Sequence, residues 1–382
     1  MNYHKLTDCE NDILLEFAEF DNGTGVRECH LMMHQVNPLR TFAEQLSGLV
    51  KSFDNVRKER YPDFKMVFGR CFVSDAANQE QPVSACMRKS GGVISVIEQP
   101  PLNGTKLAMW AYLQTDVEIR VLADNIAEAR HNGYRHLWSS MVTAEECGAY
   151  GQTKRAFGDY IEGLSSAGYD FANDCMRTWL FVNDIDNKYP AVVNARNEVF
   201  DTWNLTRSTH FISSTGIYGR KAAPGIAVQM DAYAMKGLSA KQVEHLYAPT
   251  HMNPTHEYGV RFERGTCIKF GDRREVLISG TASIDNNGEI VHKGDIRSQT
   301  HRMWENVGVL LAEADCSFAN VGHMIVYLRD SSDYLVVRTL FNERFPEVPT
   351  VIVHAPVCRP GWLIEMECMA TKADMNEQFR SF

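Results

Sequence analysis

The pattern of apolar and polar positions predicts alternating helices and strands in the last third of the chain. Between residues 299 and 314 the apolar side chains Met303, Val307 and Leu310 recur at helical spacing. The apolar run HMIVYLRD follows as a buried strand, a second helical pattern covers residues 334–345, and TVIVHA and WLIEMECMA predict two further strands. With the strands expected from REVLISGTASIDNNGEIVHKGD, the order is β-β-α-β-α-β-β, an α+β layer with helices on one face of a mixed sheet.

The chain contains a second, earlier copy of this pattern. GQTKRAFGDYIEGLSSAGYDFAN aligns without a gap with SQTHRMWENVGVLLAEADCSFAN, and both hold a Phe-Ala-Asn triplet at the same offset from a Gln-Thr pair; DCMRTWLFVND and VGHMIVYLRD follow. The alignment closes with GIAVQMDAYAMK opposite GWLIEMECMATK, which places Gln229 opposite Glu365 and Asp231 opposite Glu367. One copy therefore has Gln where the other has an acid.

Residues 1–130 show a less regular pattern. FKMVFGRCFVSD, GGVISVIEQPP and KLAMWAYLQ are typical of strands, and RHLWSSMVT is the counterpart of EVLISGTAS. We therefore expect this region to supply the opening strands of a diverged first domain. The segment HLYAPTHMNPTHEYG has the Pro and Asn content of a connector. The sequence thus predicts two domains, a diverged one over 1–245 with extra N-terminal strands and a second over 246–382.

Composition and charge narrow the class of protein. The chain has 382 residues, 44% of them hydrophobic and 23% charged, with a net charge of -9. Because phosphate binding needs clustered Lys and Arg, and no basic run occurs, we expect neither a nucleic acid nor an anionic membrane surface as partner. The ten cysteines form no CxxC pair, and the N-terminus shows no secretion signal, so a cytoplasmic protein with free thiols is expected.

The histidines and glycines form no metal or cofactor motif. The thirteen histidines show no ligand spacing, and neither GxGxxG, GxSxG nor a phosphate-loop pattern occurs. We therefore expect no metal and no cofactor.

The second copy resembles the RidA/YjgF (endoribonuclease L-PSP-like) superfamily over about residues 257–372. The resemblance is carried by ISGTASIDNNGEIVHKGD, by Gln299, Asn306 and Leu310, and by YLRD and IEMECMA. The whole chain is similar, more narrowly, to the two-domain chorismatases, through YGVRFERG, RTWLFVNDID, VNARNEVF, SSTGI and VCRPGWLIE. The resemblance implies two tandem RidA/chorismate-mutase-like domains, the first copy diverged, and a homotrimer with clefts between neighbouring sheets.

The same resemblance places the catalytic acid at Glu365, with Cys358 and Arg359 at the Cys-Arg of the chorismatase-like pattern. Chorismate carries an enol ether whose methylene carbon must be protonated before pyruvate can leave, so its site needs a neutral acid. Glu365 and Glu367 share one strand face, and burial and a like charge both raise a carboxyl pKa. Glu365 would then be the proton donor and Glu367 its tuner. The alternative is that Glu365 faces solvent or an interface salt bridge.

The carboxylates of a substrate are bound best by arginines, whose guanidinium groups donate two parallel hydrogen bonds to a carboxylate. Arg359, on the short loop before the catalytic strand, is the first choice, and a surface Arg without a ligand is the alternative. Arg177 lies in an apolar strand, where a structural ion pair explains it equally well. Arg196 falls near the Arg of the chorismatase NxGR pattern, although the Gly is missing. Tyr218 would line the cleft or serve as a turn aromatic, and Cys358 would select what attacks the cationic intermediate or act as a packed thiol.

The leading hypothesis is a chorismatase-like hydrolase that acts on a small carboxylate metabolite and releases pyruvate from chorismate or a related enolpyruvyl or cyclic carboxylate. A RidA-like enamine or imine deaminase is the second. RidA deaminases bind the substrate carboxylate with an Arg on the penultimate strand, and Val348 occupies that position in this sequence, which argues against deamination. The third is a binding protein that kept the clefts for a small metabolite without turnover.

Overall fold

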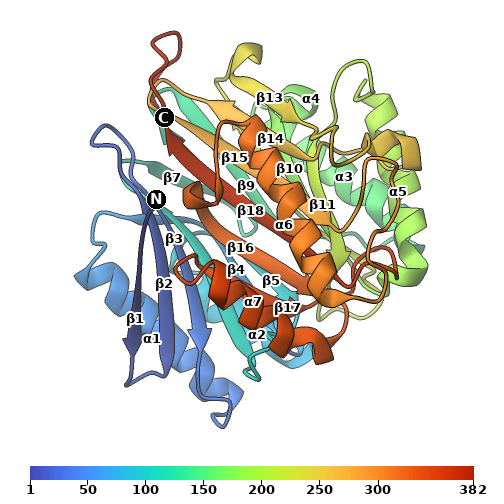
Figure 1. The fold of residues 1–382 in the computed structure, drawn as a ribbon. Coiled ribbons are helices and arrows are strands. Elements are labelled where there is room, and N and C mark those ends of the chain that lie inside the picture. The colour runs from blue at the N-terminus through green and yellow to red at the C-terminus, as the bar shows by residue number, and fades with distance from the viewer.

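The computed structural model describes residues 1–382, with the exception of the Tyr258 side chain. Its strands form three six-stranded sheets with one shared topology (Figure 1). In each sheet the fourth and sixth strands lie beside each other and the fifth forms an edge, so that the strand order is 1-2-3-6-4-5. The mixed α+β layer expected from the sequence is confirmed.

The first sheet is built from residues 2–114. It contains β1 (Asn2–Asp8), β2 (Ile13–Phe20), β3 (Glu28–Gln35), β4 (Lys65–Val73), β5 (Gly91–Glu98) and β6 (Leu107–Gln114), with α1 (Phe42–Glu59) and α2 (Ala76–Met87). Residues 1–130 were expected to add opening strands to another domain, and for residues 2–114 that expectation is wrong, because they form a complete sheet of their own. This unit lacks the Gln-Thr pair and the Phe-Ala-Asn triplet, so its sequence does not show the relation to the other two. Residues 118–131 do supply β7 and β8, the opening strands of the second sheet.

The second and third sheets follow in chain order. The second holds β7 (Glu118–Ala123), β8 (Ile126–His131), β9 (Tyr134–Val142), β10 (Cys175–Val182), β11 (Ser213–Tyr218) and β12 (Val228–Lys236), with α3 (Gly148–Ser166), α4 (Phe171–Asp174) and α5 (Ile185–Thr202). The third holds β13 (Val243–Leu246), β14 (Gly265–Lys269), β15 (Arg273–Ala282), β16 (Val321–Leu328), β17 (Thr350–His354) and β18 (Ile364–Ala373), with α6 (Ile296–Glu313) and α7 (Tyr334–Arg344). The division of the chain after residue 245 stays a prediction.

Helix α6 shows why the sequence folds as it does in this unit. The Asp295 side chain caps the helix by accepting hydrogen bonds from the backbone N–H groups of Arg297 and Ser298. The apolar stripe of the sequence, including Met303 and Leu310, is buried against the sheet. The predicted helices 299–314 and 334–345 therefore correspond to α6 and α7.

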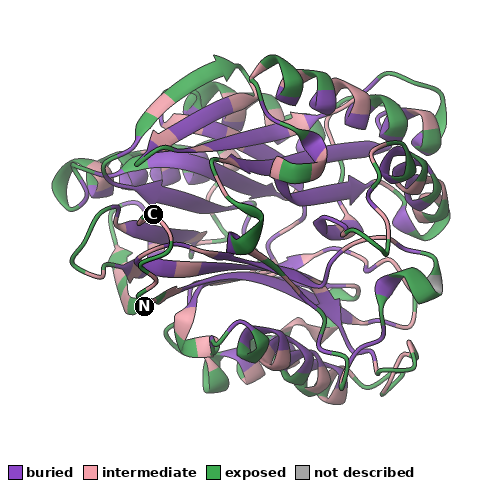
Figure 2. Ribbon diagram, turned by 90° about the horizontal axis from the view of Figure 1, so that it is seen from above, coloured by how far each residue is buried: buried purple, intermediate pink, exposed green. Residues whose placement is uncertain are grey.

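The three sheets turn their helix-free faces toward one another, and the helices lie outside, with exposed outer faces (Figure 2). The junctions run in a cycle: β5 packs against β9, β11 against β15, and β16 against β3. Each sheet thus has two neighbours within one chain. The homotrimer implied by the resemblance stays a prediction.

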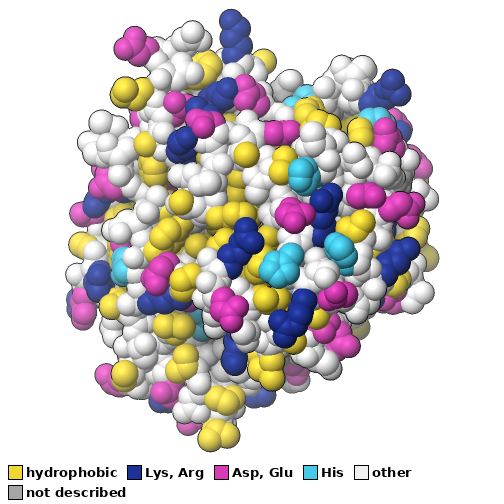
Figure 3. Space-filling view, viewed as in Figure 1, with side chains coloured by type: hydrophobic (Ala, Val, Ile, Leu, Met, Phe, Trp, Pro, Cys, Tyr) yellow, Lys and Arg dark blue, Asp and Glu magenta, His cyan; other side chains and the backbone are white. Residues whose placement is uncertain are grey.

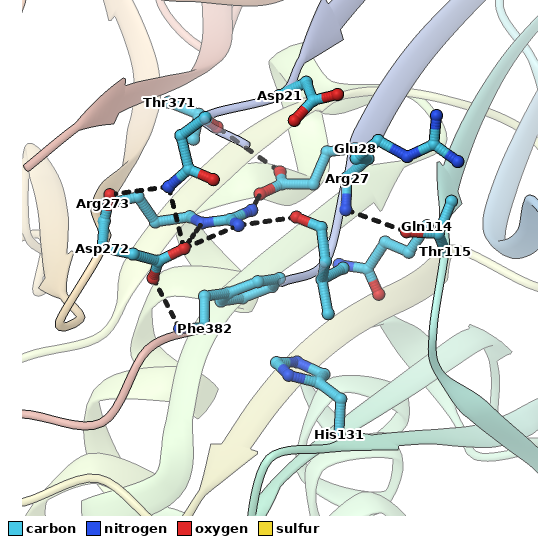
Figure 4. Close-up of polar contacts among 12 residues, drawn as sticks. Asp21, Arg27, Glu28, Gln114, Thr115, His131, Asp272, Arg273, Thr371 and Phe382 are labelled. Carbon is cyan, nitrogen blue, oxygen red and sulfur yellow. Dashed lines mark hydrogen bonds and ion pairs between the residues drawn. The ribbon is translucent and has the colours of Figure 1, made fainter. Parts of the chain in front are cut away.

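A buried polar cluster around Arg273 joins the third sheet to the first (Figure 4). The Arg273 guanidinium forms ion pairs with Glu28 of β3 and, at 2.9 Å, with Asp272. It also donates a hydrogen bond of 2.6 Å to the Val26 carbonyl. The Phe382 ring covers the guanidinium at 4.6 Å, while its backbone N–H donates to Asp272. Because these buried charges are stable only when they are paired, the ion pairs and hydrogen bonds of Arg273 hold the third sheet against the first in one arrangement.

On the face that carries α6 and α7, basic, acidic and histidine side chains are interspersed with hydrophobic ones (Figure 3). No described helix is long and apolar enough to cross a membrane.

Candidate active site

A pocket with about 520 Å³ of empty space lies at the junction of β11 and β15. The second unit contributes Tyr189 and Arg196 of α5 and Ser214 and Gly216 of β11. The third unit contributes Arg264, Gly280, Cys358, Arg359, Trp362 and Glu365, among others. Four residues singled out from the sequence, Glu365, Arg359, Cys358 and Arg196, therefore meet in one pocket built from two units.

Glu365 is the acid of this pocket. It is the second residue of β18 and is only 5% exposed. Gly280 makes room for it, because a Cβ at that position would collide with the Glu365 carboxyl. Burial, and then the charge of Glu367, raise the pKa of Glu365 to about 8, although Arg177 and Arg264 oppose the shift. Glu365 is therefore protonated at neutral pH, the state that a general acid needs.

Glu367 lies behind the pocket in a buried ionic cluster. Its carboxylate accepts hydrogen bonds from Arg177 at 2.8 Å and from the Trp179 indole N–H at 2.7 Å. Arg70 of the first sheet approaches Glu367 to 3.5 Å and binds Asp231 of the second at 2.9 Å. All three sheets thus contribute to this cluster. The geometry favours the structural ion pair for Arg177, which is not among the residues that line the pocket.

Three arginines line the pocket. Arg196 is buried on α5, and the Arg359 guanidinium lies 4.8 Å from the center of the Trp362 ring. Arg264 was not identified as a site residue from the sequence. It is buried, and its guanidinium donates a hydrogen bond of 2.9 Å to the Asn253 carbonyl. Its signal was present in YGVRFERG, but the strand pattern says nothing of the direction of a side chain just before β14.

Cys358 and Tyr218 have different surroundings. Burial, and then the charge of Glu365, raise the pKa of Cys358 to about 12, so that it stays a thiol. Gly216 allows Tyr189 to lie beside it, since a Cβ on Gly216 would come within 2.6 Å of the Tyr189 ring. Tyr218 is placed outside the pocket, further along β11, where its ring lies 6.4 Å from that of His354.

Val348 does not face Glu365. It precedes β17 and lines a hollow between the third and first units. The strand that faces Glu365 is β11, in which Ser214 occupies the position that Thr350 occupies in β17. Val348 therefore gives no information about the Glu365 pocket. Strand β11 itself, SSTGIY, contains no Arg, so the pocket's cations come from α5 and from the segments before β14 and β18.

Known proteins share both the sequence and the fold. The endoribonuclease L-PSP family model matches residues 267–372. A RutC family protein of Pyrococcus abyssi is 39% identical over 100 residues, which cover 25% of this chain and 78% of that protein. The chain belongs to the endoribonuclease L-PSP (RutC) family. The resemblance expected from the sequence is confirmed.

Two further relatives of this L-PSP family protein carry named activities. The 3-aminoacrylate deaminase RutC of Acinetobacter baylyi is 32% identical over 97 residues, 25% of this chain and 77% of that protein. The chorismatase of Streptomyces rapamycinicus is 25% identical over 267 residues, 64% of this chain and 76% of that protein. A crystal structure of chorismatase shares the fold, with a TM-score of 0.62 and 19% identity over 80% of this chain and 93% of that one.

The described side chains include no group of three or more His, Cys, Asp or Glu arranged to hold a metal ion. The chemistry of the pocket is therefore considered below in terms of Glu365 and the arginines.

Proposed function

We propose that this protein is a chorismatase-like hydrolase that releases pyruvate from chorismate or a related enolpyruvyl or cyclic carboxylate. The observation that carries the proposal is a buried Glu365, protonated at neutral pH, in one pocket with Arg196, Arg264 and Arg359. The chorismatase relative, which matches 64% of this chain, supports the same reaction class.

The reaction begins with the proton of Glu365. The methylene carbon of the enol ether takes that proton, a C–H bond forms, and the adjacent carbon becomes an oxocarbenium ion. The carboxylate left on Glu365 stabilises this cation in a pocket of low dielectric constant. Water then adds, the hemiketal collapses to pyruvate and an alcohol, and the proton lost by water restores the acid. Attack of water on a ring carbon would release the same pyruvate with a different ring product.

The arginines bind the substrate. Chorismate has two carboxylates, and a guanidinium can hold a carboxylate with two parallel hydrogen bonds. Arg196 and Arg264 are buried, so a carboxylate bound to them is screened little by solvent. Arg359 is held near the Trp362 ring at the loop before β18, which presents it beside the acid.

A coupled assay tests this proposal. The purified protein is mixed with chorismate, and pyruvate is followed with lactate dehydrogenase for the wild type and for Glu365→Gln. Glu347→Gln, which alters an exposed acid, serves as the matched control. We expect release by the wild type and the control and none by Glu365→Gln. Absence of pyruvate with the wild type would reject chorismate hydrolysis.

A second candidate function is enamine or imine deamination, favoured by the RutC deaminase relative. Protonation of an enamine at carbon uses the same neutral acid, and water then adds to the resulting iminium ion and releases ammonia. Ammonia release from an enzymatically generated enamine, dependent on Glu365, would support this function over the first. A pocket that binds carboxylates but turns over neither substrate would indicate a binding protein.

A further inference from the structure

The junctions between the sheets each contain a hollow. One lies between β5 and β9, one is the Glu365 pocket between β11 and β15, and one lies between β17 and strands β1–β3. The second residue of the last strand occupies the same place in each unit: Ala108 pairs with Phe72, Gln229 with Phe181, and Glu365 with Tyr327. The internal threefold arrangement thus repeats the pocket, but the acid is present in only one of these positions.

The hollow between β17 and β1–β3, here called the β17 groove, is walled by α7 and β17 on one side and by the first sheet on the other. It has about 800 Å³ of empty space. Both walls carry apolar side chains: Leu14 and Val36 lie on the side of the first sheet, and Phe341 and Ile352 lie on the side of α7 and β17.

Two cationic side chains, Lys5 and Arg338, line the β17 groove beside His34. An ammonium group has three donors and a guanidinium five, and neither accepts hydrogen bonds. A ligand of this groove must therefore bring acceptors.

Glu16 is the acid among the residues that line the groove, and its carboxylate is already ion-paired. Its carboxylate accepts hydrogen bonds from Lys5 at 2.6 Å and from the Thr350 backbone N–H at 3.1 Å, and it lies 3.2 Å from His34. Although burial opposes the change, the contacts with His34 and Lys5 lower the pKa of Glu16, so it remains charged and paired. Its carboxylate is thus already paired with Lys5, and Arg338 is a second cation among the residues that line the groove.

We propose that the β17 groove is a second binding site, which takes a small carboxylate with an apolar body and does not convert it. The carboxylate contacts Lys5 and Arg338, and the apolar body packs on the wall that includes Val36. Turnover is absent because Ala108 stands where the catalytic pocket has Glu365. The absence of turnover rests on the function proposed for Glu365, whereas the binding of a carboxylate in the groove does not.

Isothermal titration of the full chain with benzoate tests the proposal, with benzamide as the uncharged matched ligand. Lys5→Gln and Arg338→Glu remove the cations, and Val36→Trp fills the groove from a position that is 47% exposed, so the fold is not disturbed. Lys58→Met removes an exposed lysine elsewhere and is the matched control. Arg359→Met, in the catalytic pocket, identifies any benzoate bound there.

We expect benzoate to bind, and its dissociation constant to rise about tenfold or more in each groove variant. The charge variants lose a charge-assisted hydrogen bond, and Val36→Trp loses the space that the ligand occupies. This binding should persist in Lys58→Met and Arg359→Met and be absent with benzamide. The proposal is overturned if millimolar benzoate does not bind. It is also overturned if all benzoate binding survives Val36→Trp and the two charge variants.

Discussion

If the proposed function is right, replacement of Glu367 by Gln should move the pH at which pyruvate release is lost. Glu365 must be protonated to act, so activity falls as pH rises through its pKa, which is about 8. Burial is the first cause of this value and the charge of Glu367 the second. With Glu367→Gln the like charge disappears, while Arg177, which ion-pairs with Glu367 at 2.8 Å, keeps its positive charge. Both consequences lower the pKa of Glu365.

The size of the shift follows from the strand geometry. Residues two apart on one strand face are about 6.6 Å apart, and at an effective dielectric constant of about 20 two unit charges at that distance interact by about 2.5 kcal/mol. About 1.4 kcal/mol corresponds to one pH unit, and Arg177 already cancels part of the repulsion. We therefore expect the pH at which activity falls to half on the alkaline side, called the alkaline limb below, to be lower by about one to two units in Glu367→Gln.

The assay is the pH dependence of kcat/KM for pyruvate release between pH 5 and pH 10. Glu367→Asp keeps the charge and should retain the wild-type limb. Asp231→Asn removes another acid of the same buried cluster, one that is not among the causes of the raised Glu365 pKa. It is the control for the loss of stability that follows when a buried ion pair is broken. An unchanged limb in a folded Glu367→Gln protein would refute the reasoning.

Three further outcomes are expected. Because the pKa of Glu365 is higher in the folded protein than in the unfolded chain, the wild type loses stability as pH rises from about 4.5 to 8. In thermal melts, the free energy of unfolding of Glu365→Gln should therefore rise relative to that of the wild type by at most about 1.4 kcal/mol per pH unit in that window. A difference between the two proteins that does not change with pH would contradict this. Arg264→Met should raise KM for chorismate at least about tenfold in steady-state assays, and Arg359→Lys less, since Lys keeps the charge but not the fork; equal KM values would argue against carboxylate binding there. Gly280→Ala should lower kcat at least about tenfold by displacing the Glu365 carboxyl. It should also lower the melting temperature, because the added Cβ would come within 2.9 Å of the methyl group of the buried Thr215. Unaltered turnover would show that the contact with Glu365 does not matter.

The acids of β18 show what the sequence could predict. The alternation of WLIEMECMA placed Glu365 and Glu367 on one strand face, and the structure agrees that both lie on the inner side. Alternation along one strand does not reveal what packs against it, however. The roles of the two acids therefore separate only in the structure, where Glu365 lines the pocket and Glu367 binds Arg177 and Trp179.

The first sheet and Arg264 show what the sequence could not predict. In LAMWAY the two acids of β18 are replaced by Ala108 and Trp110, so the first unit keeps the strand geometry without the polar signature that revealed the repeat. Its contribution to the site, Arg70, acts through a pairing with Glu367 that joins distant parts of the chain. Arg264 is positioned by the loop geometry at Asn253, which has no periodic signal.

The measurement that tests the central claim most directly is the reaction of chorismate in deuterium oxide, with each pyruvate reduced at once by lactate dehydrogenase and analysed by mass spectrometry. If Glu365 protonates the methylene carbon, each lactate carries one solvent deuterium in its methyl group, and Glu365→Gln yields none of this product. Pyruvate released without methyl deuterium, or released equally by Glu365→Gln, would contradict the account.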